Sequence, residues 1–214
     1  MVKETDYAIF VYDVNDENLV FDLNSYINMH IQKILDFFEI NSLVIKPKIK
    51  IYSTKKEYDE TLEFFKDESV PKWVVGNVEQ NLIKYVSYSD FQNTSHANEP
   101  YEYYLKTIVH EYVHFITGIY CQEKNVEYPI KYISEGLAYY LSGQGESVKI
   151  NGNLKIDDIL NSNKAFASWY LLANYIIKTK GKKFFIELLC DKKLAESEAN
   201  NLLLEANCYY NGNY

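Results

Sequence analysis

Hydrophobic residues in the first hundred positions follow two spacings, an alternation of period two and a recurrence every three to four residues. Alternating or β-branched segments predict strands at Tyr7–Tyr12, Lys48–Tyr52, Trp73–Val78 and Leu82–Tyr88. The longer spacing predicts a helix over Asn24–Ile40, and the capping box of Thr54 and Glu57 predicts a second helix that runs through Lys66. The predicted order of this half is therefore β-α-β-α-β-β.

After Pro100 the pattern changes to that of helices. Helices are predicted over Tyr101–Tyr120, Lys131–Leu141, Ile156–Asn161, Ala165–Lys180, Lys182–Cys190 and Lys193–Asn207, with Gly143 as a stop and a turn at Asn151-Gly152. A sheet-bearing first half and a helical second half indicate an α+β fold. We expect one domain over residues 1–214, with an α+β lobe at 1–100 and a helical lobe at 101–214.

Composition narrows the classes of function. The 22 basic side chains are all lysine, so an arginine finger or a guanidinium clamp on a carboxylate is excluded. A net charge of −8 argues against a nucleic-acid partner, because phosphate binding needs a basic face. The three cysteines form no CxxC pair and suggest neither a cysteine zinc site nor a disulfide scaffold.

The chain also lacks the apolar run of a signal peptide or a membrane span. We therefore expect a cytoplasmic protein without a membrane span, or a secreted one if an export signal has been removed.

The strongest chemical signal is the motif His110-Glu111-Tyr112-Val113-His114, which lies within the predicted helix Tyr101–Tyr120. Four helical residues leave the two histidines about 40° apart on one face, one turn along the axis. Both imidazoles can then reach one zinc ion. Glu111 lies about 100° round from His110, which suits a proton acceptor for a water at the metal. Two of the four histidines of the chain are used in this motif.

A catalytic zinc site needs a third protein ligand and an open fourth position. Glu135 is the candidate, because it lies near the start of the next predicted helix, after a loop long enough to return antiparallel. Its neighbour Gly136 would allow a close approach of the backbone. Glu135 could equally be a solvated carboxylate in the first turn of that helix, favoured there by the helix dipole.

HEYVH followed by ISEGLAYYLSG resembles the gluzincin branch of zinc metallopeptidases, and more narrowly the small bacterial peptidase-MA-like domains. KIKIYSTKKEYDE, WVVGNV and AFASWYLLANYIIKTKGKKFFIELL extend the resemblance over nearly the whole chain. The resemblance implies a zincin-like fold, with a twisted N-terminal sheet and its helices followed by a helical C-terminal lobe. It implies that His110, His114 and Glu135 bind one Zn²⁺ ion. It also implies a peptide or protein substrate along an edge strand, a role that we assign to residues 82–89.

Two positions depart from the family pattern. Relatives usually have a tyrosine, expected to donate to the developing oxyanion, where this chain has Phe166. Tyr170, one turn later, is the candidate oxyanion donor or else a packing residue. Tyr139 stands where thermolysin-like enzymes place an aspartate that supports a histidine ligand, so another group must orient that imidazole.

These observations predict zinc-dependent hydrolysis of peptide bonds, with Glu111 as the general base. An endopeptidase is favoured, because the G-x-M-E-N segment of the clan's aminopeptidases is absent and no arginine can grip a terminal carboxylate. One alternative is an inactive pseudo-peptidase that retains zinc and binds a peptide or protein. The other is a structural or regulatory domain without a metal.

Overall fold

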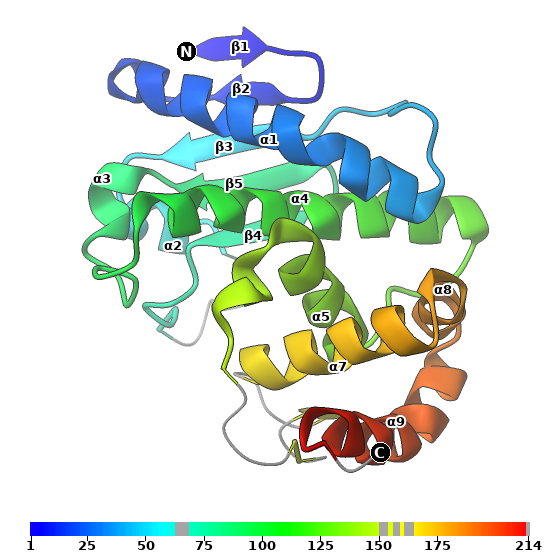
Figure 1. Ribbon diagram of the computed structural model, residues 1–214. Coiled ribbons are helices and arrows are strands. Elements are labelled where there is room, and N and C mark those ends of the chain that lie inside the picture. The colour runs from blue at the N-terminus through cyan, green and yellow to red at the C-terminus, as the bar shows by residue number, and fades with distance from the viewer. Residues whose placement is uncertain (63–68, 150–153, 156–158, 161–164, 213–214) are drawn as a thin grey trace. The chain divides into compact units, whose positions relative to one another are not determined.

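The computed structural model describes residues 1–62, 69–149, 154–155, 159–160 and 165–212 (Figure 1). The chain divides into two compact units, Met1–Phe115 and Ile116–Tyr214. The long helix α4 (Tyr101–Lys124) runs through the division. The structure is mixed α and β, so the α+β class predicted from the sequence is confirmed.

The first unit contains a five-stranded sheet in the order β1-β2-β3-β5-β4. Its elements are β1 (Val2–Glu4), β2 (Ile9–Val11), the 3-10 turn η1 (Val14–Asp16), α1 (Glu17–Phe38), β3 (Lys48–Tyr52), α2 (Lys55–Asp59), β4 (Gly76–Glu79), β5 (Leu82–Val86), α3 (Tyr88–Phe91) and the first part of α4. The three central strands β2, β3 and β5 are parallel, and each outer strand pairs antiparallel with its neighbour. Helices α1 and α4 cross one face of this sheet in Figure 1. Helical crossovers that cover the faces are the usual way to connect parallel strands.

Local sequence signals account for much of this unit. The strand at Lys48–Tyr52 has the predicted bounds, and the Thr54–Glu57 capping box has both of its hydrogen bonds. Helix α1 begins at Glu17, earlier than predicted, because buried Val20 and Leu23 continue its apolar face. The helix after the capping box ends at Asp59 instead of continuing to Lys66, and residues 63–66 of that prediction lie outside the described part.

The predicted position of the edge strand is wrong. The sequence places residues 82–89 at the edge of the sheet, but β5 lies between β3 and β4, and Tyr88 already belongs to α3. Ile83, Tyr85 and Val86 are fully buried, as the side chains of a central strand are. The outer position is taken by β4, whose four residues are all partly exposed.

The second unit is helical. It contains the end of α4, α5 (Lys131–Ser142), the 3-10 turn η3 (Gln144–Ser147), α7 (Phe166–Thr179), α8 (Lys182–Cys190) and α9 (Lys192–Tyr210). Helix α5 ends at Gly143 with φ of 75°, which confirms the predicted glycine stop. Gly136 lets α5 approach α7 closely, since a Cβ atom there would lie 2.6 Å from the carbonyl oxygen of Trp169.

The Asn151-Gly152 turn and most of the helix predicted at 156–161 lie outside the described residues. Within the described ranges, no helix combines the length and the apolar character required to cross a bilayer.

A buried lysine marks the face of the β4–β5 hairpin that carries Asn77 and Glu79. Lys84 is only 5 % exposed, and its Nζ donates to Glu79 Oε2 at 2.7 Å and to the carbonyl oxygen of Thr61 at 2.6 Å. Asn77 Nδ2 donates to the other oxygen of Glu79 at 3.1 Å. The carboxylate therefore compensates a charge that water hardly reaches, while the Glu79 side chain itself is 39 % exposed.

Because Lys84 is buried and Glu79 is partly exposed, removing the charge of one partner should destabilise the protein more than removing the other. Glu79→Gln leaves the Lys84 ammonium without its counter-ion and should lower the free energy of unfolding by about 1–3 kcal/mol. Lys84→Met leaves Glu79 to water and should cost less than about 1 kcal/mol. Urea unfolding of both variants at pH 7 measures the two costs, and a larger loss for Lys84→Met would contradict the account.

Candidate metal centre

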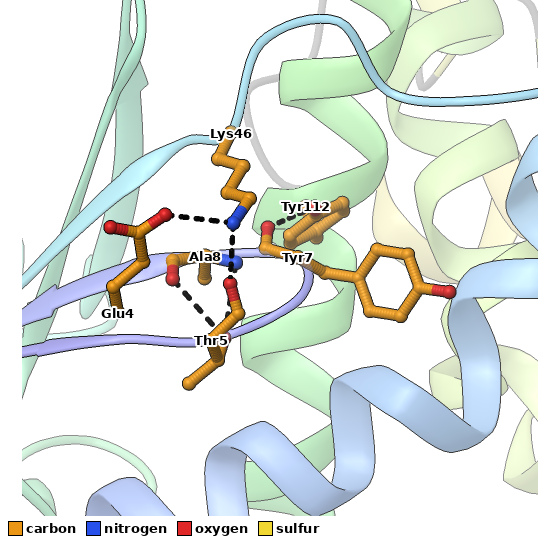
Figure 2. Close-up of polar contacts among 6 residues, drawn as sticks. All are labelled: Glu4, Thr5, Tyr7, Ala8, Lys46 and Tyr112. Atoms are coloured by element: carbon orange, nitrogen blue, oxygen red, sulfur yellow. Dashed lines mark hydrogen bonds and ion pairs between the residues drawn. The ribbon is translucent and has the colours of Figure 1, made fainter.

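Helix α4 is held against the sheet by Tyr112, the central residue of the HEYVH motif. Its ring is fully buried, and its hydroxyl donates to the carbonyl oxygen of Tyr7 at 2.6 Å (Figure 2). At about 100° per residue, Tyr112 lies nearly opposite His110 on the helix. Fixing Tyr112 on the sheet therefore turns His110 and His114 to the other side of α4.

The carbonyl that accepts this bond belongs to a braced turn between β1 and β2. Lys46 Nζ donates to Glu4 Oε1 at 2.9 Å and to the carbonyl oxygen of Thr5 at 2.8 Å (Figure 2). Thr5 Oγ1 donates to the carbonyl oxygen of Ala8 at 3.1 Å, and the Ala8 N–H donates back to Thr5 Oγ1 at 3.2 Å. The turn thus presents the Tyr7 carbonyl to α4 in one position.

The two histidines of the motif converge. Their Nε2 atoms lie 3.0 Å apart, and their rings meet edge to face with centroids separated by 4.7 Å. This separation is shorter than twice the zinc–nitrogen bond length of ~2.0–2.1 Å, so one ion can reach both nitrogens. The same separation fits a hydrogen bond between two neutral imidazoles. His110 is 7 % exposed and His114 is more accessible.

Glu111 points to the edge of the sheet. Its side chain is buried and lies against Gly76, the first residue of β4. A Cβ atom built on Gly76 would lie 2.8 Å from Glu111 Cγ and 2.9 Å from Oε1. The carboxyl group therefore lies beside the outer strand of the sheet, about 100° round the helix from His110.

Two tyrosine hydroxyls share the surroundings of Glu111. Burial raises the pKa of both Tyr58 and Tyr85 well above the ordinary value, and the negative charge of Glu111 raises each further. Both hydroxyls therefore stay protonated at neutral pH. The Tyr85 hydroxyl donates to the carbonyl oxygen of Tyr104 at 2.6 Å, whereas the buried Tyr58 hydroxyl has no hydrogen-bond partner among the described residues.

In the second unit, Glu135 lies on α5 beside Gly136. It is partly exposed, and the first turn of α5 contains no acidic residue. The alternative interpretation of Glu135 as a first-turn carboxylate favoured by the helix dipole is therefore wrong.

Phe166 and Tyr170 are both fixed by packing on α7. The Phe166 ring contacts the rings of Tyr139 and Trp169, at centroid distances of 5.6 and 5.5 Å. The Tyr170 ring covers Gly145, where a Cβ atom would lie 2.1 Å from the ring. Burial, followed by the charge of Glu146, raises the pKa of the Tyr170 hydroxyl. This packing gives Tyr170 a structural role, and its role as an oxyanion donor stays a prediction.

Sequence reasoning missed the parts of Gly76 and Tyr112 in this site. Gly76 carries a signal, because a glycine inside a strand often marks a close approach of another group. Tyr112 carries no comparable signal, since a tyrosine in a buried helix is usual.

Comparison of the chain with protein-family models, with curated proteins and with solved structures finds no match. The geometry of the described residues is therefore the basis on which a function is proposed.

Proposed function

We propose that this chain is a zinc metallopeptidase of the gluzincin type with a zincin-like fold, and that it cleaves peptide bonds within a chain. His110, His114 and Glu135 are the proposed ligands of one zinc ion. The observation that carries the proposal is the convergence of the two Nε2 atoms at 3.0 Å on one side of α4. Glu135 joins these histidines in a group of residues that could hold a metal ion.

The donor set suits zinc. Two imidazole nitrogens and one carboxylate oxygen are the ligands of many catalytic zinc sites, which keep a fourth position for water. A zinc ion held there would polarise the substrate carbonyl and lower the pKa of the attacking water to about 7.

Glu111 supplies the proton transfers. Its carboxylate, one residue after His110, accepts a proton from the attacking water and then passes this proton to the leaving amine nitrogen. The buried position of Glu111 against Gly76 limits the directions in which the carboxylate can point. Proton transfer within hydrogen-bond reach requires this kind of fixed placement.

The outer strand β4 offers the peptide a backbone to pair with. The Val86 N–H donates to the carbonyl oxygen of Val75, so Val75 belongs to a hydrogen-bonded pair of the antiparallel ladder. Such pairs alternate, which turns the backbone groups of Gly76 and Val78 away from β5. A peptide added as a strand beside β4 would pass next to Glu111, which lies against Gly76.

A second candidate function is a pseudo-peptidase that retains zinc and binds peptides. The observation in its favour is Phe166, which has no hydroxyl to donate and whose ring packs on Tyr139. Hydrolysis of a mixed peptide library, measured with and without a chelator, separates the two functions. Cleavage that depends on the metal supports the peptidase, and zinc binding without cleavage supports the pseudo-peptidase.

Metal binding should depend on the motif histidines. Purified protein dialysed against zinc should hold about one ion per chain, because a tetrahedral site needs all its protein ligands. His110→Ala and His114→Ala should each abolish stoichiometric binding, whereas His30→Ala, on α1, should leave it unchanged. Atomic absorption measures the ion content, and equal zinc in all three variants would refute the ligand assignment.

Removing the general base should separate binding from catalysis. Glu111→Gln keeps the size of the side chain but cannot accept the proton, so kcat should fall by about 10²–10⁴-fold while zinc content stays the same. A fluorogenic peptide assay on metal-loaded protein checks the rate. Full activity in this variant would exclude Glu111 as the base.

Pairing of the substrate with β4 should depend on the outward N–H of Val78. Val78→Pro removes this donor without removing a bond to β5, and proline is tolerated on edge strands. The loss of one backbone hydrogen bond, about 1 kcal/mol, should raise KM severalfold and leave zinc content unchanged. Val78→Ala, which keeps the N–H, is the control. Equal KM values for the two variants would contradict strand pairing.

A further inference from the structure

We propose that Gly76 is a positioning residue for Glu111. Its missing side chain leaves a slot on β4 in which the Glu111 carboxyl group lies, and this slot sets the direction of the general base. The inference rests on the proposed function for its catalytic meaning. The slot itself is a property of the packing.

The evidence for the slot is steric. The three atoms nearest to a Cβ built on Gly76 are Cγ, Oε1 and Cδ of Glu111, at 2.8, 2.9 and 3.0 Å. Carbon atoms in favourable contact are about 3.5–4.0 Å apart, so a methyl group at this position overlaps the carboxyl group. All three of these atoms belong to Glu111, so the overlap concerns the proposed base directly.

Backbone conformation does not require a glycine at this position. Gly76 is paired with Tyr85 in the regular antiparallel ladder, and among the described glycines those with positive φ are Gly143, Gly181 and Gly212. Alanine can therefore adopt the backbone of residue 76 without strain. What opposes the substitution is the position of Glu111.

The helix cannot easily move away to relieve the overlap. The Tyr104 hydroxyl donates to the carbonyl oxygen of Val86 at 3.0 Å, and the Tyr85 hydroxyl donates to the carbonyl oxygen of Tyr104. Tyr112 adds its hydrogen bond to Tyr7, in the turn between β1 and β2 at the end of the sheet opposite to β4. The Glu111 side chain must then rotate, and a shift of about 1 Å in a catalytic group can cost about 10²-fold in rate.

A competing explanation is that Gly76 serves only to let a substrate backbone approach β4. The two roles differ in their dependence on the side chain of residue 111. If the methyl group acts through Glu111, removing the Glu111 atoms beyond Cβ should remove the conflict. If it blocks the substrate, the side chain of residue 111 should make no difference.

The test is a double-mutant cycle of Gly76→Ala with Glu111→Ala, on protein loaded with zinc. In the wild-type background, Gly76→Ala should lower kcat by about 10²-fold, with little change in KM and unchanged zinc content. In the Glu111→Ala background, which is itself slow, the same substitution should lower kcat by less than about threefold. Equal losses of kcat in the two backgrounds, or a loss confined to KM, would overturn the proposal.

A second cycle measures the slot without any activity. Gly76→Ala should lower the melting temperature of the wild type and lower it much less in the Glu111→Ala background, where the overlapping atoms are gone. Gly118→Ala is the matched control, because a Cβ on this α4 glycine meets no described atom within 4 Å outside the neighbouring backbone of its own helix, and it should act equally in both backgrounds. If the changes in melting temperature caused by Gly76→Ala and Glu111→Ala simply add in the double variant, no slot exists.

The two cycles distinguish failure of the inference from failure of the proposed function. A wild-type chain that neither binds zinc nor hydrolyses peptides contradicts the proposed function and the catalytic role of Gly76 with it. A wild-type chain that is active but gives additive cycles contradicts the role of Gly76 alone.

Discussion

The packing of α4 on the sheet determines where each residue of the HEYVH motif points. Three hydrogen bonds fix this packing. The hydroxyls of Tyr112 and Tyr104 donate to backbone carbonyls of the sheet unit, and the Tyr104 carbonyl accepts from the Tyr85 hydroxyl on β5. Once one side of a helix is fixed, the 100° step per residue places the others. His110 and His114 then lie away from the sheet, and Glu111 lies toward its outer strand. A different rotation of α4 would bring neither the two nitrogens nor the carboxyl group to these positions.

Local signals in the sequence were sufficient for several parts of the structure. The motif helix was predictable because a long run of helical spacing surrounds it, and the pair of histidines follows from helical geometry alone. The capping box at Thr54 and the glycine stop at Gly143 were predictable for the same reason, since each involves residues close in the chain.

Features that depend on distant residues were not predictable in this way. Strand β1 has three residues and exists through its pairing with β2, so its sequence carries little signal. The order of β5 and β4 depends on the partner that β3 selects, which the alternation of β5 does not reveal. The contact of Gly76 with Glu111 joins residues that lie 35 positions apart in the sequence, and no local pattern encodes it.

The proposed function depends on the binding of a metal ion by the convergent histidines of α4. X-ray absorption at the zinc edge of the zinc-loaded protein reports which atoms are bound to the ion. If the histidines are ligands, the first shell contains nitrogen and oxygen atoms at about 2.0–2.1 Å, with the outer-shell scattering of two imidazole rings. A shell that contains sulfur, or oxygen atoms without imidazole scattering, would refute this ligand set.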